Sequence, residues 1–211
     1  VEIQKLLNQS IYNDKRLFLL IELAKAYYEL NDYSASESIL YEVTESYSKK
    51  NETAEAYYFL GQISLKRSFN YSLAKEYFDK SNQEKKSSKY AKKSKSFISK
   101  IESYENSLLQ LDSALVISPD SMDAQISADS LLFDLAQSYY FEFSRVDSSI
   151  SRHKQLINIF PTSIYYPKSL FVLSVIDSVN QEWNSKLDSN FPDFNDKNSS
   201  VSNSTGMIYS N

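Results

Sequence analysis

Cysteine, glycine and long apolar runs are absent or scarce in this 211-residue chain, and each shortage excludes a class of structure or site. The lack of cysteine excludes disulfide bonds, thiolate nucleophiles and cysteine-ligated zinc, and is compatible with a reducing or an oxidising compartment. The two glycines leave little material for tight β-turns, bulges or phosphate-binding loops. No run reaches the roughly 18 apolar residues of a membrane-spanning helix. We therefore expect a mostly helical chain with no transmembrane segment.

The charge and the apolar content narrow the class further. The net charge is −4, whereas a broad nucleic-acid surface normally needs a clustered excess of Lys and Arg. Hydrophobic residues make up 42% of the chain and aromatic residues 14%, which is ample for a core. We expect a folded protein with no nucleic-acid partner.

Few residues suit catalysis. His153 is the only histidine, and it lies at a core-facing position of a predicted helix, which favours a packed, hydrogen-bonded side chain over a catalytic base. Glycine-rich phosphate loops, paired-histidine zinc spacings and nucleophile elbows are missing from the sequence. Acidic pairs such as Glu42 and Glu45 have the ordinary spacing of a solvated helix face. The sequence therefore predicts no catalytic residues, no metal site and no cofactor, and the protein is expected not to be an enzyme.

A repeated pattern organises the chain. Four segments begin with a leucine followed by a small residue, with the leucines 37, 75 and 38 residues apart: Leu23-Ala24, Leu60-Gly61, Leu135-Ala136 and Leu173-Ser174. Each segment continues through a helix of about 14 residues, a polar turn and a second helix. Small residues at these positions, and Ser36, Ala74 and Ser149 on the second helices, allow two helices to pack closely. The predicted fold is an all-α helical-hairpin solenoid.

The repeats suggest a division of the chain. Residues 1–14 are the end of a preceding helix, 15–82 are two repeats, 121–192 are two more with the last one short, and 193–211 form a polar, disordered tail. Two of the four prolines punctuate the second pair of repeats. Proline is tolerated in the first turn of a helix and disfavours helix in the residue before it, so Pro161 is expected to end one helix and Pro167 to open the next.

Residues 88–118 contain no glycine or proline and predict one long connecting helix, which the stretch 118–123 then breaks. Its apolar residues recur at spacings of four and three: Phe97, Ile101, Tyr104, Leu108, Leu111 and Leu115. This stripe has two interpretations. It packs on the neighbouring repeat helices as core, or it forms a coiled-coil seam with a second protein.

The Leu-small pairs, Tyr27 and Tyr139 one turn later, the turns at 31–33 and 70–71, and the prolines Pro161 and Pro192 resemble tetratricopeptide (TPR) repeats. The stretch "FPTSIYYPKSL" with the later "NFPDF" resembles the bacterial cell-envelope subgroup, which includes an outer-membrane assembly lipoprotein and a Tol-Pal coordinator protein. The turn glycine of the family is absent in every unit. The resemblance implies a protein-binding scaffold in the periplasm, associated with the outer membrane, peripherally or through a lipid anchor. A cytoplasmic location is the alternative. The chain begins at Val1, which leaves open a signal peptide or lipid-anchoring cysteine upstream, or an incomplete chain.

In this family the first helices of the repeats line a groove for extended or helical peptides. Projection of the first helices inward selects aromatic and amide side chains, which suit a protein or peptide partner. The candidate groove residues are Tyr28, Tyr58, Gln62, Phe133, Gln137, Tyr140, Phe141 and Phe171. Burial of these residues as internal core is the competing interpretation.

Lysines crowd the beginning of the long helix. The candidate basic docking residues are Lys85, Lys86, Lys89, Lys92, Lys93 and Lys100. The run is either a solvated face or a docking patch for an acidic protein or an anionic lipid surface. The main functional expectation is a non-catalytic interaction scaffold. The alternative is a structural subunit that self-assembles or docks through residues 88–118 and their lysine-rich face.

Overall fold

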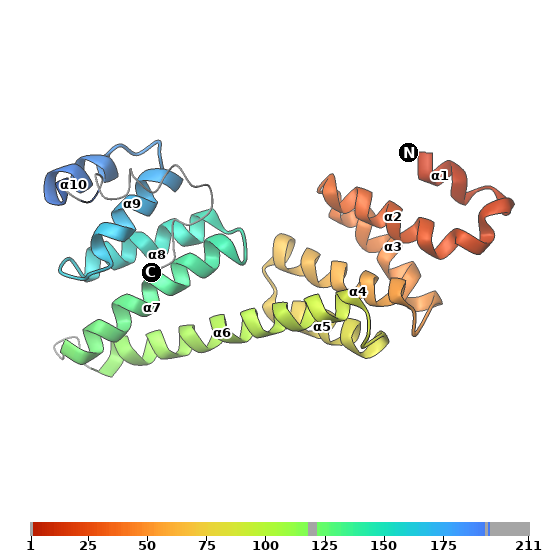
Figure 1. Ribbon diagram of the computed structural model, residues 1–211, viewed down its shortest axis with the longest axis horizontal. Helices are drawn as coiled ribbons and strands as arrows, with labels where there is room; N and C mark the ends of the chain where they lie inside the picture. The colour runs from red at the N-terminus through yellow and green to blue at the C-terminus, as the bar shows by residue number, and fades with distance from the viewer. Residues whose placement is uncertain (1, 118–121, 193, 195–211) are drawn as a thin grey trace. The chain divides into compact units, whose positions relative to one another are not determined.

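A computed structural model describes residues 2–117, 122–192 and 194, with the backbone alone for residues 10, 116–117 and 122–127. Every regular element in these residues is helical, which confirms the all-α prediction (Figure 1). The elements of the first half are α1 (Glu2–Leu7), a 3₁₀ helix (Ser10–Lys15), α2 (Arg16–Glu29), α3 (Tyr33–Ser46), α4 (Asn51–Ile63), a π-helical turn (Ser64–Ser68) and α5 (Tyr71–Glu84). Those that follow are α6 (Lys89–Ile117), α7 (Met122–Phe141), α8 (Val146–Ile159), α9 (Tyr166–Ile176) and α10 (Glu182–Asn190). The predicted break at 118–121 and the predicted tail, apart from Phe194, lie outside the described residues.

The chain divides into two compact units, Val1–Ser103 and Tyr104–Asn211. The boundary falls inside α6, so the first half of this helix belongs to one unit and the second half to the other. The sequence predicts one long helix over 88–118, and α6 confirms it over Lys89–Ile117. What the sequence does not predict is that this helix is shared between two units.

The first unit is built from two helical hairpins, α2 with α3 and α4 with α5. Polar residues begin the second helix of each hairpin, because their side chains accept a hydrogen bond from an otherwise unpaired backbone N–H of the first turn. Asp32 accepts from the N–H of Ala35 at 3.1 Å, and Asn70 accepts from the N–H of Leu73 at 2.9 Å. The hairpins enclose a core with the following buried members: Leu20, Ile21, Ala24, Tyr28, Leu40, Val43, Ala56, Leu60 and Ile63.

The small residues allow the close helix packing that their positions predict. The Ser36 hydroxyl is buried and donates to the backbone oxygen of Ala24, 2.9 Å away on the other helix of the hairpin. Gly61 faces the ring of Phe78, and a Cβ atom at residue 61 would lie 2.5 Å from that ring. The absence of a Cβ atom at Gly61 therefore allows α4 and α5 to approach this closely.

The second unit contains the second half of α6 and the hairpins α7 with α8 and α9 with α10. Helix α8 ends at Ile159, Phe160 is buried, and Pro167 lies in the first turn of α9, so the two prolines punctuate the chain as predicted. Tyr104 of α6 packs edge-on against Tyr139 of α7, and their hydroxyl groups are 2.6 Å apart.

Three residues of the apolar stripe of α6 lie in the core: Ile101, Tyr104 and Leu111 are at most 6% exposed. The other three, Phe97, Leu108 and Leu115, are half-buried. The core interpretation therefore holds for the three buried residues, because the chain itself covers them. Of the helices that the structure describes, none combines the length and the apolar character needed to cross a membrane.

Candidate functional site

A row of aromatic rings joins the first helices of the repeats in the first unit. Tyr28 of α2 packs edge-on against Phe59 of α4, with ring centroids 5.1 Å apart, and Phe59 packs on Tyr58 at 5.4 Å. Tyr58 in turn contacts Tyr90 and Phe97 of α6 at 5.3 and 6.1 Å. These five residues form what we term the aromatic row.

The two predicted groove tyrosines in this row differ in exposure. Tyr28 is 7% exposed and lies beneath the ammonium group of Lys66, 4.6 Å from its ring centroid. Tyr28 therefore belongs to the core and does not line an open groove, which is the second of the two interpretations of the groove candidates, and this burial raises its pKa. Tyr58 is half-buried, and burial raises its pKa to about 12. Of the two, only Tyr58 offers surface to a partner.

Two glutamines occupy the same repeat position, directly after the small residue that follows the leading leucine. They are Gln62 in α4 and Gln137 in α7, and both are half-buried. The side-chain nitrogen of each is shielded from solvent and has no hydrogen-bond partner among the described residues. An unsatisfied buried donor costs about 1–3 kcal/mol, so each amide gains a hydrogen bond when its side chain turns and brings the nitrogen to an acceptor of a partner.

Lys25 holds the equivalent position in the first repeat, and its charge is already matched. Its ammonium group lies 2.6 Å from Glu22 and 3.3 Å from Glu55. Burial opposes the charge of Lys25, but the hydrogen bond and the charges of the two glutamates outweigh it and raise its pKa. At this repeat position, α2 therefore presents a neutralised ion cluster, whereas α4 and α7 present the amides of Gln62 and Gln137.

The candidate residues of the second unit also divide into core and surface. Phe133 is 9% exposed and stacks on Tyr165 at 4.9 Å, so it belongs to the core rather than to an open groove. Tyr140 and Phe141, at the end of α7, are 36% and 52% exposed. Phe171 of α9 is half-buried, and Phe194 packs on its ring at 6.1 Å. The exposed candidates of this unit are thus concentrated at the end of α7.

His153 is a packed core residue, as its position predicts. It is 1% exposed, and its Nδ1 atom lies 3.1 Å from the Ser169 hydroxyl. Burial lowers the pKa of His153 from 6.5 to about 4, so the ring is neutral near pH 7. Its Nε2 atom is buried without a described partner. A ring sealed in this way does not reach a substrate.

The lysines at the start of α6 are exposed, except for the half-buried Lys100. Three of them rest their ammonium groups near aromatic rings: Lys89 lies 4.9 Å from the Tyr90 centroid, Lys93 lies 5.8 Å from that of Tyr58, and Lys100 lies 5.4 Å from that of Phe97. Such contacts are worth about 0.5–1 kcal/mol each at exposed sites. Lys93 therefore borders the exposed edge of the aromatic row.

Within the described ranges, no set of three or more His, Asp or Glu residues is arranged to hold a metal ion. No family model, curated protein or solved structure matches the chain.

Proposed function

We propose that this protein is a non-catalytic protein-interaction scaffold of the TPR type. The observation that carries the proposal is the pair of unsatisfied amide groups, Gln62 and Gln137, at one repeat position in two units. Each lies on the first helix of a hairpin, with half-buried or exposed aromatic rings on the same helix: Tyr58 on α4, and Tyr140 on α7.

The mechanism is recognition of an extended segment by groups held on rigid helices. In either unit, a backbone carbonyl group of a bound segment accepts a hydrogen bond from the amide of that unit, and apolar side chains of the segment pack on the neighbouring rings. Each hydrogen bond is favourable because the amide nitrogen loses no other partner when it forms. Aromatic side chains add large contact area at low cost in conformational entropy.

For the location we propose the bacterial cell envelope, within an outer-membrane assembly or secretion complex. Support comes from the stretch 160–170, whose Phe-Pro and Tyr-Pro steps resemble the envelope subgroup. Within this stretch Phe160 packs inward and Pro167 opens α9. Fractionation of the source cells tests this point, and recovery in the cytoplasm alone would contradict it.

The interaction function is tested with a random peptide library displayed on phage and selected against the intact chain. The affinity of the selected peptides is then measured for the wild type, for Gln62→Ala, for Gln137→Ala and for Gln110→Ala. Gln110 is exposed on α6 and supplies the matched control. We expect roughly tenfold weaker binding for whichever of Gln62→Ala and Gln137→Ala lies in the occupied unit, since one hydrogen bond is lost. Unchanged affinity in both variants, or no selected peptide, would refute the proposal.

A further inference from the structure

The fold gathers lysines from two separate loops at one end of the first unit. The loop between α3 and α4 carries Lys49 and Lys50, and the loop between α5 and α6 carries Lys85 and Lys86. The loops are joined directly, because the backbone N–H of Lys49 donates to the Glu84 carboxylate at 2.5 Å. The Lys49 ammonium group also donates to the backbone oxygen of Gln83 at 3.4 Å.

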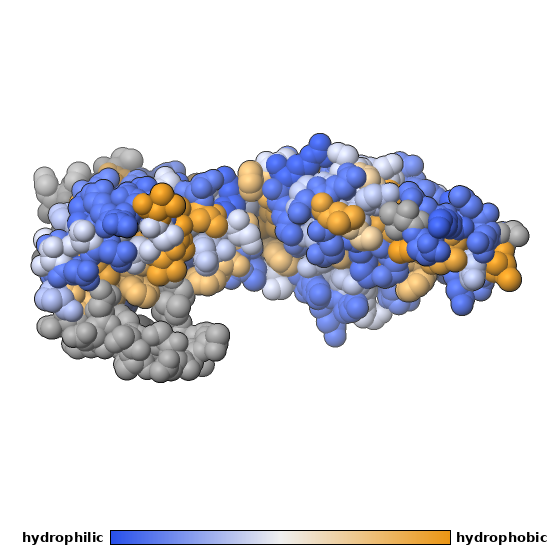
Figure 2. Space-filling model, turned by 90° about the horizontal axis from the view of Figure 1, so that it is seen from above, coloured by the Kyte–Doolittle hydropathy of each residue, from blue (hydrophilic) through white to orange (hydrophobic). Residues whose placement is uncertain are grey.

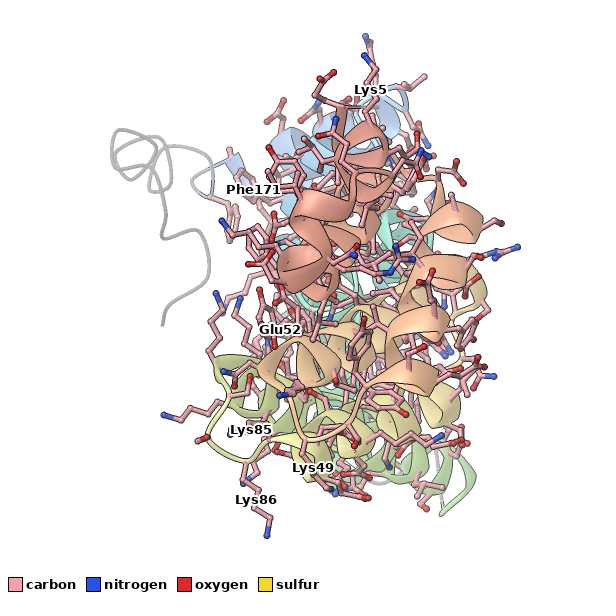
Figure 3. The ribbon with its side chains drawn as sticks, turned by 90° about the vertical axis from the view of Figure 1, so that its right-hand side faces the viewer. Lys5, Lys49, Glu52, Lys85, Lys86 and Phe171 are labelled. Carbon is pink, nitrogen blue, oxygen red and sulfur yellow. The ribbon has the colours of Figure 1, made fainter. Side chains whose placement is uncertain are left out.

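Together with Lys89 and Lys92 of the first turn of α6, these loop lysines make up what we term the basic edge: Lys49, Lys50, Lys85, Lys86, Lys89 and Lys92. All six side chains are exposed, and none forms an ion pair with a carboxylate in the described part of the chain. Figure 3 shows Lys49, Lys85 and Lys86 at the same end, with Lys86 extending away from the ribbon and Glu52 farther along the unit. Four of the six are among the basic docking residues predicted from the sequence, and the fold brings Lys49 and Lys50 beside them.

The basic edge has the opposite sign of charge from the chain as a whole. Residues 85–100 hold seven lysines and no acidic residue, while the whole chain has a net charge of −4. The one carboxylate fixed between the two loops, that of Glu84, is hydrogen-bonded to a backbone N–H. The edge therefore presents uncompensated positive charge on a chain that is otherwise acidic.

The chemistry of the edge identifies the partner. It is made of lysine alone, whereas arginine is the side chain that matches a single carboxylate or phosphate through two parallel hydrogen bonds. Protein interfaces are depleted in lysine and depend on aromatic and arginine anchors. Among residues 85–92 the aromatic residue is Tyr90, which is 8% exposed and so provides neither an anchor for a protein nor a stacking surface for a base.

We propose that the basic edge docks on an anionic lipid bilayer. Many point charges on flexible stems suit a surface of mobile, negatively charged headgroups, because the attraction requires no fixed geometry. Each lysine within reach of the surface strengthens binding by about five-fold. This inference concerns a different surface from the amides of the proposed function and does not depend on it.

The test is flotation of the intact chain with vesicles of phosphatidylcholine containing about 30% phosphatidylglycerol, and with vesicles of phosphatidylcholine alone. Lys85→Gln/Lys86→Gln is compared with Lys5→Gln/Lys15→Gln, which has the same net charge and alters exposed lysines outside the edge. Circular dichroism checks that all three proteins have the same helix content. We expect binding to the anionic vesicles alone, weakened by about 25-fold in the edge variant and little in the control variant.

Four results would overturn the inference. The first is no binding to anionic vesicles at low salt, and the second is an equal loss in both variants, which would mean that net charge rather than the edge decides binding. The third is affinity that does not fall as salt is raised to about 0.5 M, because screening must weaken an exposed electrostatic contact. Binding of polyglutamate or a single-stranded oligonucleotide through Lys85 and Lys86, without vesicle binding, would assign the edge to a different partner and refute the lipid proposal.

Discussion

Acidification should destabilise the second unit through His153, well above the pH at which carboxylates become protonated. The ring is enclosed by α7 and α9: Phe133 packs edge-on at 5.5 Å, Ser169 lies next to Nδ1, and Nε2 has no described partner. Burial alone lowers the pKa of His153 to about 4. A proton therefore binds the unfolded chain more tightly than the folded one.

The size of the effect follows from the two pKa values, 6.5 in the unfolded chain and about 4 in the folded one. The free energy of unfolding is complete above the unfolded pKa and falls as the pH drops towards the folded pKa. Linkage gives a loss of about 2 kcal/mol between pH 7 and pH 5, and of about 3 kcal/mol by pH 4. Burial also raises the pKa of Asp134, so protonation of this carboxylate stabilises the folded state as the pH falls. The usual pKa of an aspartate is about 3.8, so this opposite effect belongs to a lower pH range than the titration of the histidine. The interval from pH 7 to pH 5 thus isolates the histidine.

Trp183 provides the assay. It is the only tryptophan in the chain, lies in the second unit, is 6% exposed, and donates its Nε1–H to Asp177 at 2.9 Å. Urea unfolding followed by its fluorescence at pH 7, 6 and 5 measures the unit that contains His153. His153→Phe fills the site with an aromatic ring that does not titrate, and we expect it to abolish most of the loss. The same pH dependence in the wild type and in His153→Phe would show that His153 does not cause the loss of stability.

Three further substitutions test the packing, each by urea unfolding followed by circular dichroism. Gly61→Ala should destabilise the first unit by about 1–3 kcal/mol, because the new methyl group would meet the buried ring of Phe78; a gain of stability, as helix propensity alone predicts, would contradict the close packing. Asn70→Ala should cost about 1 kcal/mol through loss of the cap on the N–H of Leu73, and no change would mean that the cap contributes nothing. Ser144→Gly should stabilise the second unit by about 0.5 kcal/mol, because Ser144 has a φ of 53° that glycine adopts without steric cost; a loss would show that its side chain matters more than its backbone.

Hairpins and helix ends were predictable because they depend on local chemistry. Small residues after Leu23, Leu60 and Leu135 mark where helices approach, and prolines mark where helices begin and end. The apolar stripe of α6 was predictable as well, since spacings of four and three place its residues on one face. Periodicity alone left open whether the stripe is core or a coiled-coil seam, and the burial of Ile101, Tyr104 and Leu111 places these three residues in the core.

The exposure of single aromatic residues was not predictable in the same way. Tyr28 and Phe133 project from first helices like Tyr58 and Tyr140, but they are covered by neighbours from distant parts of the chain, as Tyr165 covers Phe133. The membership of Lys49 in the basic edge also depends on a contact between loops 35 residues apart in sequence. Both features depend on tertiary packing, which the residue pattern of a single helix does not reveal. Figure 2 shows that apolar residues still reach the surface among the charged ones, so hydropathy by itself does not identify the core.

If the amide of Gln62 or of Gln137 holds a bound segment, its side-chain NH₂ group reports the binding directly. A ¹⁵N-labelled chain titrated with a selected peptide shows these groups as resolved pairs of resonances. We expect saturable shifts for Gln62, Gln137 or both, with the resonances of Gln110 unmoved. Shifts confined to other residues, with both amides unchanged at saturation, would contradict it.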